Sequence, residues 1–308
     1  MILCCGEALI DMIPVEAEGA TAFAPLAGGA VFNTAIALGR LGQPVGFLSG
    51  ISTDLLGEIL GTQLRKSNVS TKYLLESDRP TTLAFVKLDN GQARYSFYDE
   101  NTAGRMILAA DLPEIGRDVE AMFFGGISLI GEPCGSTYEA LLNREHGERL
   151  IMLDPNVRPG FIREEALYRG RIRRMCAMSD ILKLSDEDLH WLEGDGQIDA
   201  MAASLLTQGP KIVVITRGAD GACAYTAHDK INVAGRKVDV IDTVGAGDTF
   251  NAGFLAGLKE HDLLTKRCVQ RAGRDAIAYA LKLGVAAASV TVSRKGANPP
   301  LTREISLD

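Results

Sequence analysis

Short apolar runs alternate with amphipathic stretches along this chain of 308 residues. Strands that alternate with helices imply a largely parallel sheet covered on both faces, with ligands at the carboxyl ends of the strands. Apolar runs bounded by turn residues predict buried strands at 2–5, 45–48, 122–124, 150–153, 181–184 and 212–215. Segments with one apolar face predict helices at 31–41, 55–66, 135–143, 164–178 and 200–206.

The region 73–98 departs from this rhythm, because its apolar and polar residues alternate with a period of two. The segments 82–88 and 94–98 are joined by Asp89-Asn90-Gly91, a strong signal for a β-hairpin. With this period, Tyr95 and Phe97 share one face of the second strand. We expect the hairpin to be a flap over a ligand or a contact between subunits.

Composition is that of a globular protein, with 46% hydrophobic and 23% charged residues. The net charge of -7 argues against binding of nucleic acid, although a local pocket can still take an anionic substrate. Six cysteines without CxxC spacing predict a reduced, cytoplasmic protein. The four histidines are not paired at ligand spacing, so we expect no zinc site.

We expect neither a targeting segment nor a membrane span. The apolar N-terminal run has no basic leader. The longest apolar tract, 277–292, contains Lys282 and is expected to be too short and broken to cross a bilayer. A buried helix that runs into a strand suits this tract better.

The most informative segment is 242–250, which reads DTVGAGDTF and leads into a helical run. Gly245 and Gly247 can adopt backbone angles that other residues avoid and let a ligand approach the main chain. Free amides and the positive dipole end favour an anion at the start of a helix. The neighbouring Asp248 is better suited to take a proton from the group that attacks this anion. The segment therefore predicts phosphoryl transfer to an alcohol.

Several other nucleotide and hydrolase motifs are missing from the sequence. There is no GxxxxGK[ST] loop, no GxGxxG after the first strand, and no GxSxG or HExxH motif. A P-loop nucleotide site and a Rossmann dinucleotide enzyme are therefore excluded.

Two glycine clusters far apart in sequence give the chain a family resemblance. Gly28, Gly29 and Asn33 match the N-terminal signature of the ribokinase-type (PfkB) sugar kinases, and 242–250 matches the C-terminal signature. In order and separation the chain resembles this family over essentially its full length. The resemblance implies a single domain, 1–308, with a ribokinase-like three-layer α/β/α sandwich. It also implies a small β-sheet lid formed by the inserted segments 12–27 and 72–105.

The resemblance implies a role for each matching residue. Asp248 would be the general base, and the amides of Gly245, Ala246 and Gly247 would form the anion hole for the transferred phosphoryl group. Sugar hydroxyls need hydrogen-bonding partners when they are desolvated, and the resemblance implies a set of substrate-binding residues for them. These are Asp11, Gly28, Gly29, Asn33, Arg158 and, from the lid, Tyr95 and Phe97.

ATP and Mg²⁺ are the cofactors that the resemblance implies, with K⁺ as a further candidate. Ser185 and Asp188 stand where the family usually has Asn and Glu for magnesium, so the choice between Asp188 and Glu187 stays open. A monovalent cation would be held by backbone carbonyls near Asp242, Val244 and Gly296. The residues expected on the nucleotide side are Lys183, Ser185, Thr216, Gly218 and Gly221.

The segments 80–82 and 97–103 look most like those of bacterial fructokinases. The leading hypothesis is therefore transfer of phosphate from ATP to the 6-hydroxyl of D-fructose, by a homodimer joined through its lid. A 2-keto-3-deoxygluconate kinase, a ribokinase or a nucleoside kinase is the alternative, and Arg94, Arg105 or Arg158 could bind the carboxylate of a sugar acid. A non-catalytic sugar- or nucleotide-binding protein is the alternative of another class.

Overall fold

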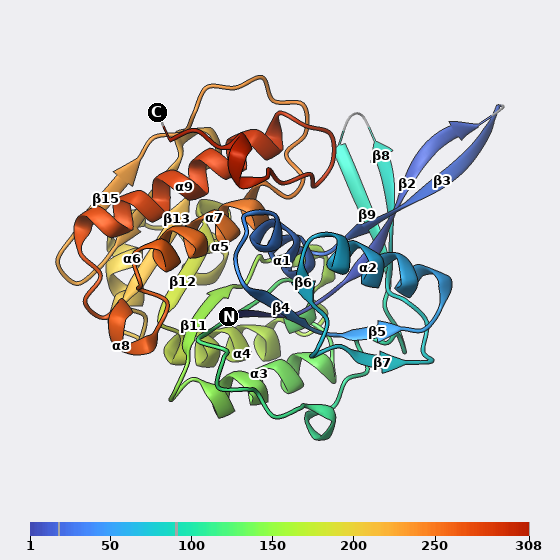
Figure 1. Cartoon of the computed structure of the whole chain (residues 1–308), viewed down its shortest axis with the longest axis horizontal. Helices are drawn as coiled ribbons and strands as arrows, with labels where there is room; N and C mark the ends of the chain where they lie inside the picture. The colour runs from blue at the N-terminus through green and yellow to red at the C-terminus, as the bar shows by residue number, and fades with distance from the viewer. Residues whose placement is uncertain (18, 90–91, 308) are drawn as a thin grey trace.

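A long, mostly parallel sheet forms the centre of the computed structural model, which describes residues 1–17, 19–89 and 92–307 (Figure 1). Within these residues the sheet has nine strands, and only the β13–β14 and β14–β15 pairs are antiparallel. All six predicted strands are present and lie next to one another in the sheet. In spatial order the strands are β15 (Lys230–Val233), β14 (Ala222–Tyr225), β13 (Ile212–Thr216), β12 (Ile181–Ser185), β11 (Leu150–Asp154), β10 (Ala121–Gly125), β1 (Ile2–Cys5), β4 (Val45–Leu48) and β6 (Val69–Ser70).

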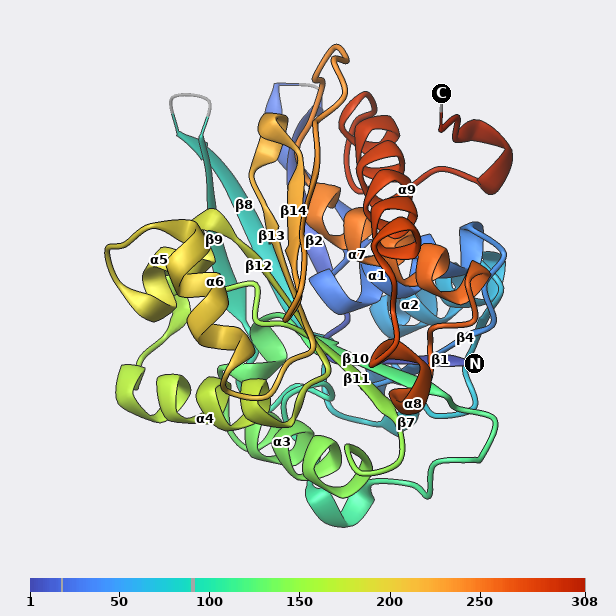
Figure 2. The ribbon, with the colours of Figure 1, turned by 90° about the vertical axis from the view of Figure 1, so that its left-hand side faces the viewer.

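Helices cover both faces of this sheet and give three layers (Figure 2). The two faces carry separate hydrophobic cores, and the adjacent residues Cys4 and Cys5 point into different ones because strand side chains alternate. One face is covered by α1 (Ala30–Arg40), α2 (Leu55–Lys66), α7 (Ala246–Glu260), α8 (Lys266–Val269) and α9 (Arg274–Val292). The other is covered by α3 (Cys134–Glu145), α4 (Glu165–Met178), α5 (Asp186–Glu193) and α6 (Ile198–Leu206).

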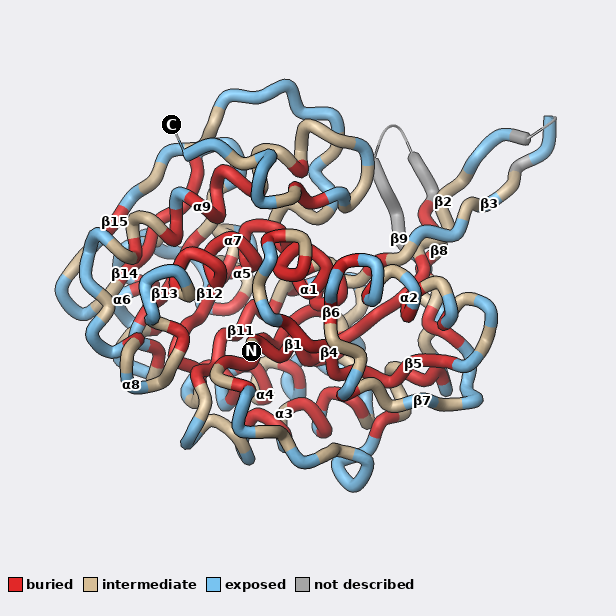
Figure 3. Tube along the Cα trace, viewed as in Figure 1, coloured by how far each residue is buried: buried red, intermediate tan, exposed pale blue. Residues whose placement is uncertain are grey.

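Helix α7 lies between α1 and α9, and every residue from Asp248 to Leu258 is buried (Figure 3). Small residues allow the close approach of α9: a Cβ on Gly253 would lie 2.8 Å from the Cα of Gly284. A Cβ on Gly257 would lie 2.6 Å from the Cα of Ala280. The start of α7 is therefore held in place by packing along its whole length.

The tract 277–292 is entirely helical, so the strand expected at its end is wrong. Apolar residues continue the helical pattern of α9 through Val292, and no turn residue interrupts it. The 19-residue helix is also long and apolar enough to cross a membrane, contrary to the expectation from its sequence. Half of its most apolar window is buried, and it packs along α7 as a core helix does.

A second sheet stands beside the sandwich (Figure 1). Its strand order is β3 (Ala20–Gly28), β2 (Leu9–Ala17), β8 (Leu83–Asp89) and β9 (Gln92–Tyr98). Strands β8 and β9 pair antiparallel as their alternating pattern predicts, and the turn residues Asn90 and Gly91 lie outside the described residues. The segment 72–105 also includes β7 (Leu75–Ser77), which pairs with β5 (Gly50–Ser52) in a separate sheet. That part of the expected lid segment therefore does not join the small sheet.

Candidate active site

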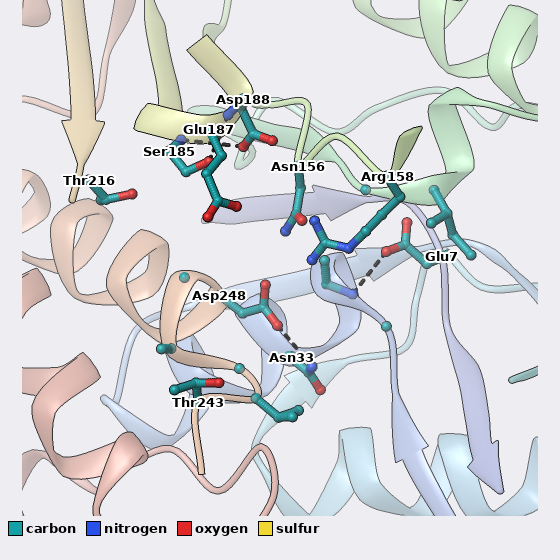
Figure 4. Close-up of a pocket in the computed structure, with 18 of the residues that line it drawn as sticks. Glu7, Asn33, Asn156, Arg158, Ser185, Glu187, Asp188, Thr216, Thr243 and Asp248 are labelled. Atoms are coloured by element: carbon teal, nitrogen blue, oxygen red, sulfur yellow. Dashed lines mark hydrogen bonds between the residues drawn. The ribbon is translucent and has the colours of Figure 1, made fainter. Parts of the chain in front are cut away.

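A cavity of about 530 Å³ opens at the carboxyl ends of the parallel strands (Figure 4). It lies where such sheets bind ligands, and both the main sheet and the small sheet contribute side chains to it. The residues predicted from sequence that line it are Asp11, Gly29, Asn33, Phe97, Arg158, Lys183, Ser185, Glu187, Asp188, Thr216, Gly218, Val244, Gly245, Ala246, Gly247 and Asp248. Gly28, Gly221, Asp242 and Gly296 are not among the lining residues, and the side chain of Tyr95 lies outside the described residues.

The start of α7 presents open backbone amides to the cavity. Gly245 is the N-cap, with a left-handed φ of +77°, and no side chain caps the helix. A Cβ at this position would lie 2.8 Å from the Cβ of Ala297, so glycine is required there for space as well as conformation. Among the described residues, no protein acceptor is found for the amides of Gly245, Gly247 and Asp248. Ala246, which we expected in the anion hole, donates instead to the carbonyl of Thr243 at 3.3 Å.

Asp248 lies in the first turn of α7, is 6% exposed and lines the cavity. Its Oδ2 accepts a hydrogen bond from Asn33 Nδ2 at 2.9 Å (Figure 4). Burial raises the pKa of the Asp248 carboxyl to about 7, against the opposing effect of the Asn33 hydrogen bond. A carboxyl with this pKa gains or loses its proton near neutral pH, which suits a general base.

Lys183 lies beneath the glycine turn and lines the cavity. Its Nζ is 2.9 Å from Asp154 Oδ2, and both residues are almost completely buried. Asn251 Nδ2 donates to the same oxygen at 2.7 Å, one turn after Asp248. The buried ion pair joins β11, β12 and α7, and the nucleotide contact of Lys183 stays a prediction. Both charges of this pair act on Asp248, Asp154 raising and Lys183 lowering its pKa.

The sugar side of the cavity is formed by β2, α1 and the small sheet. Burial raises the pKa of Asp11 to about 6. Gly28 lies behind this carboxylate, because a Cβ there would be 2.2 Å from Asp11 Oδ2, so contact with Asp11 is by itself enough to explain the glycine. Phe97 of β9 contacts Phe161 edge-on at 4.5 Å between ring centroids, and both rings line the cavity. This aromatic pair joins the small sheet to the sandwich across the cavity.

Arg158 and Asn156 follow β11 and project into the cavity (Figure 4). The Arg158 guanidinium donates to the neighbouring carbonyl of Val157 at 3.0 Å. Arg105, the other described arginine considered for a sugar acid, does not line the cavity. It pairs with Asp99 at 2.9 Å and donates to a backbone carbonyl.

Ser185 and Asp188 form a capping box at the start of α5. Asp188 Oδ2 accepts from the Ser185 amide at 3.3 Å, and Oδ1 accepts from the Val157 amide at 3.0 Å. Burial also raises the pKa of Asp188. Glu187 is exposed, lines the cavity and points toward Asp248 (Figure 4). Of the two acids considered for magnesium, Glu187 is thus the one whose carboxylate is available.

On the described residues, no cluster of three or more acidic, His or Cys side chains could hold a metal ion by itself. A divalent cation in this cavity would therefore need phosphate oxygens and water among its ligands. Glu187 fits such a site, since one or two carboxylates suffice beside a nucleotide.

The glycine turn after β13 places Thr216 and Gly218 on the cavity wall. Gly221 lies behind this turn with a φ of +89°, where a Cβ would be 2.2 Å from the carbonyl oxygen of Val233. Its glycine is therefore explained by backbone packing.

Asp242 ties two loops together outside the cavity. Its Oδ1 accepts from the Val244 amide at 3.0 Å and its Oδ2 from the Gly296 amide at 2.9 Å. These bonds bring the three residues of the expected monovalent-cation site into one place, while cation binding itself stays a prediction.

Among the lining residues that were not predicted as site residues from sequence are Glu7, Gly126, Asn156 and Phe161. Glu7, Gly126 and Asn156 stand just after β1, β10 and β11, and the carboxyl ends of parallel strands are the expected ligand edge. That position was the signal available for these three. Phe161 had no such signal, because its role depends on contact with Phe97.

The fold and cavity define the class of the protein: a ribokinase-like α/β protein whose site holds a buried carboxylate beside an uncapped helix start. The chain belongs to the pfkB family of carbohydrate kinases, whose model matches residues 1–304. It is 60% identical over 270 residues to a fructokinase of Rhizobium leguminosarum bv. trifolii, covering 87% of this chain and 83% of that protein.

Solved structures agree with this family. The fructokinase of Xylella fastidiosa with bound ATP superposes with a TM-score of 0.90 at 27% identity, covering 99% of this chain and 97% of that one. The aminoimidazole riboside kinase of Salmonella enterica shares the fold, with a TM-score of 0.81 at 24% identity, over 98% of this chain and 95% of that one. The predicted family, the ribokinase-like fold and the assignment as a phosphotransferase acting on a sugar hydroxyl are thus confirmed. The non-catalytic alternative is not supported.

Proposed function

We propose that this protein transfers the γ-phosphoryl group of ATP to the 6-hydroxyl of D-fructose, giving fructose 6-phosphate and ADP. The observation that carries the proposal is the position of Asp248, between the open amides of α7 and the sugar side of the cavity. ATP and fructose are suggested by the relatives, which include a fructokinase with bound ATP and a fructokinase at 60% identity.

In the proposed reaction Asp248 takes the proton of the 6-hydroxyl as that oxygen attacks the γ-phosphorus. The new oxygen–phosphorus bond forms while the bond from the γ-phosphorus to the bridging oxygen breaks, and that oxygen leaves with ADP. The amides of Gly245, Gly247 and Asp248 hold the charge that develops on the transferred group. Asn33 keeps the base oriented through its 2.9 Å hydrogen bond. Positioning and electrostatics are the main requirements of such a transfer.

A neutral sugar suits the cavity better than a sugar acid. The carboxylate of Asp11 lines the cavity and can only accept hydrogen bonds when ionised, as sugar hydroxyls require. When ionised, Asp11 and Glu7, which also lines the cavity, would repel a substrate carboxylate. Arg158 is the observation that keeps 2-keto-3-deoxygluconate as the second candidate, because its guanidinium lines the same cavity.

Magnesium would be held by Glu187 together with the nucleotide phosphates and water. It would neutralise charge on the phosphate oxygens when bound. The loops joined by Asp242 are the proposed place for a monovalent cation such as K⁺.

We also propose a homodimer through the small sheet, in the cytoplasm. Among the side chains of this sheet that the structure describes, four large apolar ones are exposed: Val15, Phe23, Leu26 and Tyr98. Exposed apolar groups on a small sheet favour association with another chain. The six cysteines are all unpaired thiols, which accords with a reducing compartment.

The substrate proposal is tested by ADP release with fructose, ribose, nucleosides and 2-keto-3-deoxygluconate at equal concentrations. We expect fructose to give the highest kcat/KM, at least about 10-fold above that of 2-keto-3-deoxygluconate, since one unfavourable charge contact is worth more than about 1.4 kcal/mol. A higher kcat/KM for 2-keto-3-deoxygluconate would reject fructose as the substrate.

The role of the base is tested by Asp248→Asn, which keeps the shape of the side chain and removes the proton acceptor. We expect kcat to fall by about 10²- to 10⁴-fold, with ATP binding by calorimetry unchanged. Because the pKa of Asp248 is raised to about 7, the base is protonated and inactive below that pH. In the unmodified enzyme kcat/KM should therefore fall about tenfold per pH unit below pH 7.

Wild-type turnover in the Asp248→Asn variant would remove the base assignment. A kcat/KM that stays level from pH 7 down to pH 5 would contradict it equally.

The magnesium proposal is tested by Glu187→Gln. We expect the Mg²⁺ concentration for half-maximal activity to rise about 10-fold, within the range that loss of a metal-supporting group produces. Glu193→Gln, at the other end of α5, is the matched control and should leave this concentration unchanged. Equal Mg²⁺ requirements for all three proteins would exclude Glu187.

The dimer proposal is tested by light scattering. We expect a mass of twice the 32.9 kDa chain, and a single-chain mass after the double substitution Phe23→Asp and Leu26→Asp. A single-chain mass for the unmodified protein at micromolar concentration would reject the dimer.

A further inference from the structure

Glu7 is a buried carboxylate in the cavity that the proposed reaction does not yet use. It directly follows the turn after β1, is 7% exposed and lines the cavity (Figure 4). Within the part of the chain that the structure describes, no cation forms an ion pair with it. A buried carboxylate without a cation is unfavourable unless hydrogen bonds compensate for the lost water. Its position therefore calls for an explanation.

The two oxygens of Glu7 connect two separate segments. Oε1 accepts from the amide of Ala30, the first residue of α1, at 2.8 Å. Oε2 accepts from the amide of Ser128, within the short 3₁₀ helix η2 (Ile127–Leu129), at 3.3 Å. The carboxylate thus occupies the start of α1 and joins it to the turn after β10.

The surrounding backbone is shaped to admit this side chain. Gly126 has a φ of +71°, and a Cβ there would lie 2.2 Å from Glu7 Oε1. Gly29 has a φ of +109°, and a Cβ there would lie 2.9 Å from the carbonyl oxygen of Glu7. Both glycines occupy conformations that other residues rarely adopt. Two glycines in such conformations lie against Glu7, so the backbone around this residue is specifically adapted to it.

The first turn of α1, which Glu7 anchors, holds Asp248 in two ways. Asn33 Nδ2 donates to the carboxylate of Asp248 at 2.9 Å. The single hydroxyl proton of Thr34 is shared between the main-chain carbonyl of Asp248, at 3.2 Å from Oγ1, and that of Ala30, at 3.0 Å. Both of these hydrogen bonds from α1 to the proposed base start within four residues of the amide that Glu7 binds.

We propose that Glu7 is a positioning residue for phosphoryl transfer: its carboxylate fixes the first turn of α1 so that Asn33 and Thr34 hold Asp248 in place. The proposal rests on the proposed function in so far as Asp248 is the base. The geometry that joins Glu7 to Asp248 holds for any acceptor alcohol.

The pKa of Asp248 is a measure of how well Glu7 positions Asn33 against it. The Asn33 hydrogen bond lowers the pKa of Asp248, and burial raises it. The charged groups that act on Asp248 from neighbouring elements are Asp154 of β11, Lys183 of β12 and Arg158 of the loop after β11. A change at Glu7 leaves these three in place, so a loosened Asn33 contact would raise the pKa of Asp248.

The test is Glu7→Gln, which keeps the size of the side chain but leaves one acceptor oxygen for two amide donors. We expect kcat to fall about 10-fold, as a misplacement well below 1 Å would produce, with the KM for ATP unchanged. We expect the midpoint of the acidic limb of kcat/KM to move upward. The double variant Glu7→Gln with Asn33→Ala should be slowed by less than the product of the two single effects, because both changes act on the Asn33–Asp248 contact.

A readout independent of turnover is the carboxyl titration of ¹³C-labelled aspartate, with Asp248→Asn used to assign the signal. In Glu7→Gln the Asp248 midpoint should lie above that of the unmodified protein. If no sugar is turned over by the unmodified protein, the proposed function fails, while this titration still decides the role of Glu7.

Asp54→Asn is the matched control. Asp54 also caps a helix and joins it to another segment, accepting from the Gly57 amide at 2.7 Å and the Thr81 amide at 2.9 Å. It lies away from the cavity, so its loss should lower Tm without moving the Asp248 titration. A Glu7→Gln variant that behaves like this control, with lower Tm but unchanged kcat and titration, would overturn the proposal. If Glu7→Gln does not fold, Glu7→Asp is measured by the same criteria, because it keeps the charge but is too short to reach both amides.

Discussion

The site depends on burying Asp248 at the start of α7 while leaving it able to ionise. Burial is the largest cause that raises the pKa of this carboxyl, to about 7 once its polar contacts are included, so loss of a polar contact would raise the pKa further and leave the group protonated at neutral pH. The Asn33 hydrogen bond and the nearby Lys183 ammonium oppose that effect. Lys183 is itself neutralised by Asp154, so the pair adds little net charge beneath the glycine turn. The base is thus balanced by contacts from α1 and β12, two elements that reach it from different sides.

This balance requires a rigid first turn of α7. Close packing against α9 through Gly253 and Gly257 fixes the helix along its length. Asn251, one turn beyond Asp248, ties the helix to the Asp154–Lys183 pair on the sheet. The open amides at the helix start can then face an anion without rearrangement, which is the condition for electrostatic stabilisation of a transferred group.

Features with a local sequence signal could be predicted, whereas contacts between residues far apart in sequence could not. The strands, the glycine turn and Asp248 were predictable because their signals lie within a few consecutive residues. The Asn33 contact to Asp248 spans 215 positions in sequence, so only the family resemblance placed both residues in one site. The capping box of Ser185 and Asp188 was visible as a local pattern and was overlooked in favour of a metal role. The protein contacts of Gly28, Gly221 and Lys183 could not be predicted, since each depends on how separate strands pair in the fold.

The cavity is acidic for a site that must accept a nucleotide triphosphate. Glu7, Asp11, Asp186, Glu187, Asp188 and Asp248 line it, against the cations Arg158 and Lys183, and Lys183 is already paired. Glu7 and Asp188 are each bound by two backbone amides, Asp11 has a pKa raised by burial, and Asp248 is bound by Asn33. Glu187 is exposed and points toward Asp248 (Figure 4), so it is the acid proposed to face the phosphates. A carboxylate beside a phosphate would repel it. A divalent cation bound between the two would remove this repulsion, with Glu187 as one of its ligands. The dependence of the proposed reaction on magnesium thus follows from the charges of the cavity as much as from the chemistry of ATP.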